Sequence, residues 1–166
     1  MAADPVLRWG SHGERTAGGL LLIIGGALAI AGSNTFTLWL LALGTVGHAA
    51  GWTIMPGPGL RRLAAALVST LAVWLLISGN PRFVGVAVVP YLFWLLVTRA
   101  PALAWLTALL PAAAAVVVAL VAGPDFFSDR GMLPALGMVA AATAVAALAT
   151  WGIRRALSRR NPSGTP

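Results

Sequence analysis

Six apolar runs, none of which contains Asp, Glu, Lys or Arg, are the feature that most constrains this sequence. Each run is about long enough to cross the ~30 Å hydrocarbon core of a membrane as a helix. Short breaks with proline, glycine, asparagine or arginine separate the runs, and such residues favour helix ends. The sequence therefore predicts an all-α bundle of six short transmembrane helices, at residues 17–33, 36–55, 63–79, 83–98, 102–123 and 132–153.

The composition argues for a membrane protein and against a soluble one. Hydrophobic residues make up 59% of the 166 residues and charged residues only 9%, whereas soluble domains carry about 25% charged residues. The 11 basic residues, all of them arginine, flank the apolar runs and form no patch for nucleic acid. Arginine without lysine, together with abundant alanine, is typical of GC-rich genomes. We therefore expect a multi-pass protein of a bacterial cytoplasmic membrane that binds no nucleic acid.

Two of the runs leave an alternative open. The first run follows Arg8 and Arg15 and ends in a small-x-small sequence at 29–31, as a cleaved signal peptide would. The fourth run is short and contains Pro90, so it could enter and leave the membrane on one side. That arrangement gives five crossings and places the arginine-rich tail outside, whereas arginine is enriched on the cytoplasmic side. We therefore expect the fourth run to be a span.

The distribution of arginine predicts the orientation, because arginine is enriched on the cytoplasmic side. With six crossings and a cytoplasmic N-terminus, nine arginines lie inside and only Arg82 and Arg130 lie outside. The sequence thus predicts an N-in, C-in protein with a cytoplasmic segment at 1–16 and a basic tail at 154–166, whose last residues, 161–166, are expected to be disordered. Four of the inner arginines are expected to contact anionic lipid headgroups: Arg61, Arg62, Arg154 and Arg155.

Few residues could carry chemistry. The chain has no cysteine, which excludes thiolate metal sites and cysteine nucleophiles. The acidic residues fall on both sides of the predicted membrane, so they cannot hold one Mg²⁺ ion. A dyad of Ser69 and His48 is conceivable, but no nucleophile elbow surrounds Ser69. We therefore expect no catalytic site, no metal and no cofactor.

His48 is the single ionisable side chain inside a predicted run, and it lies between Gly47 and Gly51. Small residues at this spacing let two helices approach closely, and the imidazole can hydrogen-bond across the contact. A packing role is favoured over a proton relay, a ligand contact or a haem ligand, because no His, Cys or carboxylate lies at helical spacing. Gly137 and Ala141 predict a second packing face, either within the bundle or against a partner or another copy.

Trp74 and Tyr91 lie deep in their runs, where an indole N–H or a phenol needs a hydrogen-bond partner. Two functions are consistent with these sequence features. The first is a non-enzymatic membrane subunit or scaffold, supported by the missing intramembrane charges and the small-residue faces. The alternative is a small-solute-binding or permease-type protein with a mid-membrane pocket near His48, Trp74 and Tyr91. A polar cavity at that depth would distinguish them.

Three runs in each half also suit an inverted repeat.

Overall fold

The structure, a computed structural model, describes residues 10–78, 81–121 and 132–160, and within these ranges it is helical with no strand. The predicted disorder of 161–166, the predicted outer loop around Asp125 and the ends of the 63–79 and 102–123 runs lie outside the described residues. The elements are α1 (His12–Ala31), α2 (Leu38–Ile54), α3 (Gly59–Trp74), η1 (Leu75–Ser78), η2 (Pro81–Val88), α4 (Val89–Val97), η3 (Ala102–Ala108), α5 (Leu109–Val121) and α6 (Met132–Arg160).

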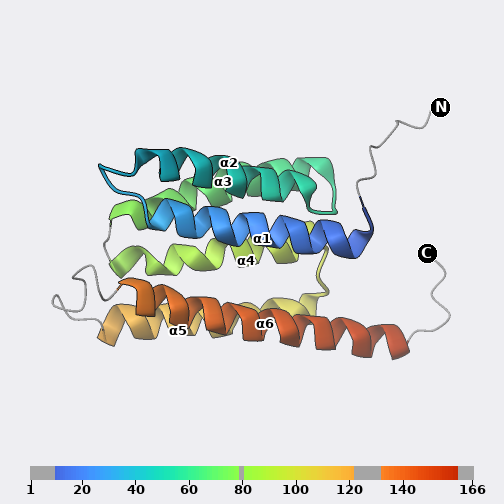
Figure 1. The fold of residues 1–166 in the computed structure, drawn as a ribbon. Coiled ribbons are helices and arrows are strands. Elements are labelled where there is room, and N and C mark those ends of the chain that lie inside the picture. The colour runs from blue at the N-terminus through green and yellow to red at the C-terminus, as the bar shows by residue number, and fades with distance from the viewer. Residues whose placement is uncertain (1–9, 79–80, 122–131, 161–166) are drawn as a thin grey trace.

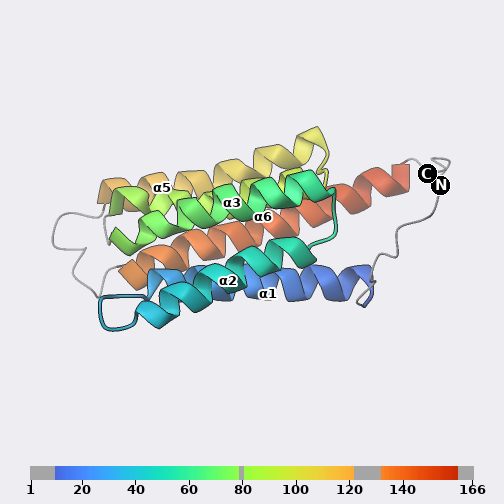
Figure 2. The same cartoon turned by 90° about the horizontal axis from the view of Figure 1, so that it is seen from above.

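The helices lie side by side with alternating directions, and the start of α1 lies at the same end of the bundle as the end of α6 (Figure 1). Three 3₁₀ turns extend α-helices: η1 continues α3, η2 leads into α4 and η3 leads into α5. Neighbours in sequence are neighbours in space, since α1 packs on α2, α2 on α3 and α5 on α6. The view from above shows α1 and α2 side by side (Figure 2). The described ranges thus contain the six helical segments that the apolar runs predict.

Four of these segments are long and apolar enough to cross a membrane: His12–Ala31, Gly59–Ile77, Ala102–Val121 and Pro134–Arg159. The apolar helices Leu38–Ile54 and Phe83–Val97 are shorter. Large apolar side chains cover the outside, with Leu21 exposed by 73% and Leu120 by 80%. Apolar surface of this kind suits contact with lipid rather than water.

Several helices extend beyond the predicted apolar runs. The first helix begins at His12 and not at 17, because the Ser11 hydroxyl caps the Glu14 N–H while the Glu14 carboxylate caps the Ser11 N–H. Arg61 and Arg62, expected in a loop, lie in the first turn of α3. The last helix does not end at 153 but continues to Arg160, because nothing in 154–160 breaks a helix. Most of the predicted basic tail is therefore helical.

Two prolines inside the predicted runs lie where 3₁₀ geometry changes to α geometry. Pro90 is the second residue of α4 and Pro111 is the third residue of α5. A proline in the first turn of an α-helix costs no hydrogen bond, because the first N–H groups have no partner within the helix. The 3₁₀ turns η2 and η3 lie immediately before these first turns. Each proline therefore marks a junction between 3₁₀ and α geometry.

Candidate functional site

Glycine residues allow α1 and α2 to approach very closely. A Cβ atom on Gly26 would lie 2.5 Å from the backbone nitrogen of His48, and one on Gly51 would lie 2.7 Å from the Gly19 carbonyl oxygen. Gly44 faces Gly26 in the same way. Gly47 lies at the edge of this contact, since the nearest atoms to its added Cβ are 4.0 Å away. The close pair in α2 is therefore Gly44 and Gly51, one on each side of His48, and not Gly47 and Gly51.

His48 is fully buried at this contact and hydrogen-bonds to three elements. Its Nδ1 lies 2.8 Å from the Ile23 carbonyl oxygen of α1, and its Nε2 lies 2.9 Å from the Ser69 Oγ of α3. The indole nitrogen of Trp52, one turn further along α2, lies 3.3 Å from the same Nε2. One side chain thus joins the first three helices.

The partners determine the tautomer of His48. A carbonyl only accepts, so Nδ1 carries the proton and donates it to Ile23. An indole N–H only donates, so Nε2 is unprotonated and accepts from both Trp52 and Ser69. The neutral imidazole therefore uses both of its nitrogens within the bundle, and a proton added at Nε2 would face the indole N–H. This geometry suits a packing histidine rather than a proton relay or a haem ligand.

Tyr91 belongs to a separate cluster of hydroxyl groups. Its phenol oxygen lies 2.7 Å from the Thr107 Oγ1 and 2.9 Å from the Thr150 Oγ1, and the two threonine oxygens are 2.9 Å apart. Thr107 also donates to the Ala104 carbonyl oxygen at 2.5 Å. The protons of Tyr91 and Thr150 remain for the contacts among the three oxygens, so no hydroxyl proton is left for a solute. The cluster connects α4, η3 and α6.

Trp74 lies on the outer surface, with 43% of its area exposed, and its indole nitrogen donates to the Thr45 Oγ1 at 2.9 Å. The three residues that the sequence places around one pocket therefore lie in three separate hydrogen-bond groups. None of them lines either of two cavities in the described part of the chain.

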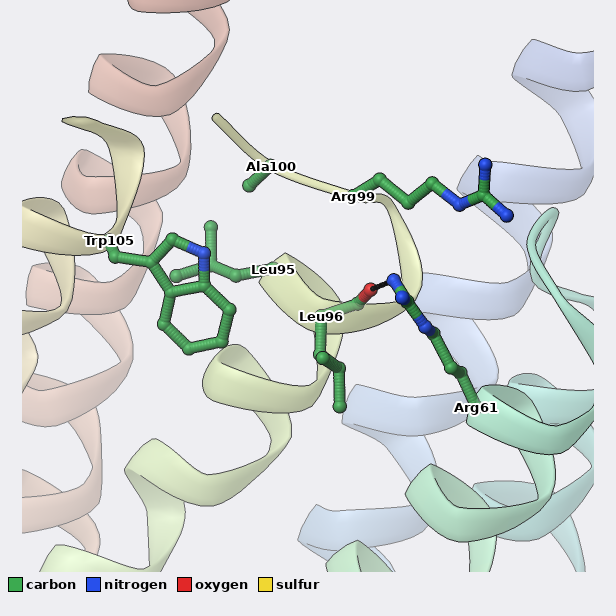
Figure 3. Close-up of a pocket in the computed structure, with 6 residues that line it drawn as sticks. All are labelled: Arg61, Leu95, Leu96, Arg99, Ala100 and Trp105. Atoms are coloured by element: carbon green, nitrogen blue, oxygen red, sulfur yellow. Dashed lines mark hydrogen bonds between the residues drawn. The ribbon is translucent and has the colours of Figure 1, made fainter. Parts of the chain in front are cut away.

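One of the two cavities is apolar and the other is basic. The apolar groove, of about 380 Å³, lies between η2, α4 and α5 and is lined by Gly85, Val88, Val89, Leu92, Ala112, Ala115, Val116 and Ala119. The basic pocket, of about 410 Å³, lies at the end of the bundle where α1 begins and α6 ends. Its lining residues are Arg61, Leu95, Leu96, Arg99, Ala100 and Trp105 (Figure 3).

Arginines at this end of the bundle bind the carboxyl ends of two helices. At the end of α2, Arg15 donates to the Ile54 carbonyl oxygen at 3.2 Å and Arg62 donates to that of Thr53 at 2.7 Å. Carbonyl groups in the last turn of a helix lack partners within it, and cations favour that end. These contacts join residues up to 39 positions apart, so sequence spacing gave no signal for them.

The end of α4 is bound in the same way. Arg61 donates to the Leu96 carbonyl oxygen at 3.0 Å, and Arg154 donates to the Thr98 carbonyl oxygen at 3.3 Å and to its hydroxyl at 2.6 Å. Arg154 also lies over the Trp94 ring, 5.6 Å from its centroid. Arg61 and Arg154, which the sequence assigns to lipid headgroups, thus also hold the bundle together. Arg155 lies over the Trp151 ring, 3.4 Å from its centroid.

The turn after α4 contains a residue that sequence analysis overlooked. Arg99 has φ 49°, the only non-glycine residue with positive φ in the described chain. The Ala100 N–H donates to the Leu95 carbonyl oxygen at 2.9 Å and the Arg99 N–H to that of Leu96 at 3.3 Å, the two bonds of a Schellman motif. Glycine is the usual residue at this position, and a larger residue costs roughly 1–2 kcal/mol there.

The predicted packing residues of the last helix, Gly137 and Ala141, face outward. Nothing lies within 4 Å of a Cβ built on Gly137, and Ala141 is exposed. Within the described residues, no group of three or more His, Cys, Asp or Glu side chains could hold a metal ion. No family model, no curated protein and no solved structure matches this chain.

Proposed function

We propose that this protein is a non-catalytic subunit or scaffold of a bacterial cytoplasmic membrane, with six spans and both termini in the cytoplasm. The observation that carries the proposal is that His48, Tyr91 and Trp74 each hydrogen-bond to partners within the chain. A permease-type site would need polar groups that converge on a cavity. The groove away from the arginine end has an entirely apolar lining. The exceptions among the described residues are the buried Thr70 hydroxyl, the Trp94 indole N–H and the Nε atoms of Arg62 and Arg154, which lack a partner.

The arginine distribution supports the orientation. The arginines that bind the ends of α2 and α4 lie at the end of the bundle where α1 begins and α6 ends (Figure 1). An even number of crossings brings the termini to one side, and arginine favours the cytoplasmic side.

The outer face of α6 supports a role in assembly. Gly137, Ala141 and Ala144 are exposed and lie at the spacing of one helix face. Small residues on such a face allow a second helix to approach closely in a membrane, where packing rather than the hydrophobic effect drives association. We expect this face to contact another membrane protein or a second copy of this chain.

Single cysteine variants test the assembly role, because the natural chain has no cysteine. Ala141→Cys, labelled with a benzophenone and irradiated in native membranes, should give one discrete protein adduct. Leu120→Cys is the matched control, since Leu120 is 80% exposed on α5 and outside the small-residue face. It should give lipid adducts only. Equal protein adducts from both positions, or none from Ala141→Cys, would contradict the proposal.

A further inference from the structure

The basic pocket is formed by three parts of the chain that are distant in sequence. Arg61 comes from the first turn of α3, Leu95 to Ala100 form the last turn of α4 and the turn after it, and Trp105 comes from η3. Figure 3 shows Arg61 reaching the Leu96 carbonyl and the Arg99 side chain leaving the adjacent turn in the direction away from Trp105. Apolar side chains of Leu95, Leu96 and Ala100 line the pocket beside the two arginines and the indole ring.

No acidic side chain in the described part of the chain neutralises the two guanidinium groups. Glu14 is the only acidic residue in the described part of the chain, and its carboxylate binds the Ser11 N–H at the start of α1. The Arg61 Nη1 donates to the Leu96 carbonyl, which fixes its direction and leaves further N–H groups for another acceptor. No described residue hydrogen-bonds to the Arg99 side chain. The pocket therefore presents two positive charges without a counter-ion from the described chain.

The backbone of Arg99 gives an independent reason to assign a role to its side chain. Its φ of 49° is one that glycine adopts without strain. The Schellman motif itself needs only the backbone of this residue. An arginine in a strained position, with its side chain unused by the fold and lining a pocket, points to a function for the guanidinium.

The surroundings indicate which anion fits. Guanidinium groups bind phosphate oxygens with two parallel hydrogen bonds, and two of them can share one phosphate. Trp105, 39% exposed, forms an aromatic wall of the kind found at membrane interfaces. Leu103 and Leu106 on the same 3₁₀ turn are 54% and 60% exposed, so acyl chains could run alongside them.

We propose that Arg61, Arg99 and Trp105 form a specific binding site for a phosphate group, with the headgroup of an anionic phospholipid as the source that the apolar surroundings favour. Arg99 contributes charge, Arg61 contributes charge and a fixed direction, and Trp105 packs beside the glycerol region. This site does not depend on the proposed scaffold role, and it is tested on the purified protein.

The test compares Arg99→Gly with Arg159→Gln. Glycine suits the backbone at position 99, so Arg99→Gly should fold. Its unfolding temperature should equal or exceed that of the wild type. Arg159 is exposed near the end of α6 and does not line the pocket, so Arg159→Gln removes one charge without touching the site. Short-chain phosphatidylglycerol, titrated into each protein in neutral detergent, should bind about fivefold more weakly to Arg99→Gly. Binding to Arg159→Gln should match the wild type.

A second titration distinguishes the sources of phosphate. Displacement of the lipid by millimolar inorganic phosphate would support a general phosphate site, and failure of phosphate to displace it would support a lipid site. Arg99→Lys should restore part of the affinity. Wild-type affinity in Arg99→Gly would overturn the proposal, as would equal losses in Arg99→Gly and Arg159→Gln, because that result would mean unspecific attraction by net charge.

Discussion

Single polar residues connect helices here, and His48 is the clearest case. Its ring accepts from Ser69 and Trp52 and donates to Ile23, so three helices depend on one side chain. Arg62 and Arg154 act similarly from the first turn of α3 and from α6, where they donate to carbonyl groups of other helices. Arginine at the start of α3 is unfavourable for the dipole of that helix. The contacts of Arg62 with α2 and of Arg61 with α4 give the physical reason for arginine at this position.

His48→Leu should destabilise the protein by roughly 0.5–2 kcal/mol, because it removes the acceptor of Ser69 and Trp52 and the donor to Ile23. The free energy of unfolding in detergent measures this loss. His48→Gln, which keeps an amide that can hydrogen-bond, should lose less. Ser69→Ala should cost stability in the wild type and much less in the His48→Leu background. Equal costs of Ser69→Ala in the two backgrounds would show that the two side chains do not interact.

At the scale of helices, the contact between α1 and α2 depends on glycine at defined positions. Gly26→Ala would push a methyl group to 2.5 Å from the His48 backbone nitrogen. The helices must separate to accept it, so we expect a loss of about 1–3 kcal/mol. Gly25→Ala is the matched control, since nothing lies within 4 Å of its added Cβ and alanine is the better helix former. Thermal unfolding should show a lower midpoint for Gly26→Ala and an unchanged or higher one for Gly25→Ala. Equal midpoints would refute the close contact.

Sequence patterns predicted the helical segments well, because apolar runs and the breaks between them are local signals. The capping box at Ser11 and Glu14 was also a local signal, and it would have placed the start of α1 correctly. Register between helices is not local. Nothing in the sequence indicates that Gly44, and not Gly47, faces Gly26, or that Tyr91 meets Thr150 across 59 positions. The positive φ of Arg99 could not be predicted either. Pro101, two residues later, predicts a turn but does not give the sign of φ at Arg99.

At the scale of the whole molecule, the two ends of the bundle differ in charge. The described end that holds the N-terminal start of α1 also holds the ends of α2 and α4 and the arginines bound to them. Those arginines satisfy helix carbonyls, and in the proposed orientation they would also lie on the side of the membrane that arginine favours. Structural capping and orientation thus use the same residues, so substitutions that change one should change the other.

The orientation itself is open to a direct test. A reporter that is active only in the cytoplasm, fused after Arg160 in a bacterial host, should give signal, because six crossings return the chain to the arginine-rich side. A reporter that is active only in the periplasm should give no signal there. The same pair fused after Pro124, which follows the fifth predicted span, should give the opposite result. If the fourth segment, Phe83–Val97, which is short for a span, did not cross the membrane, both fusion points would exchange their signals. The two positions together therefore distinguish six crossings from five without any knowledge of a substrate or partner.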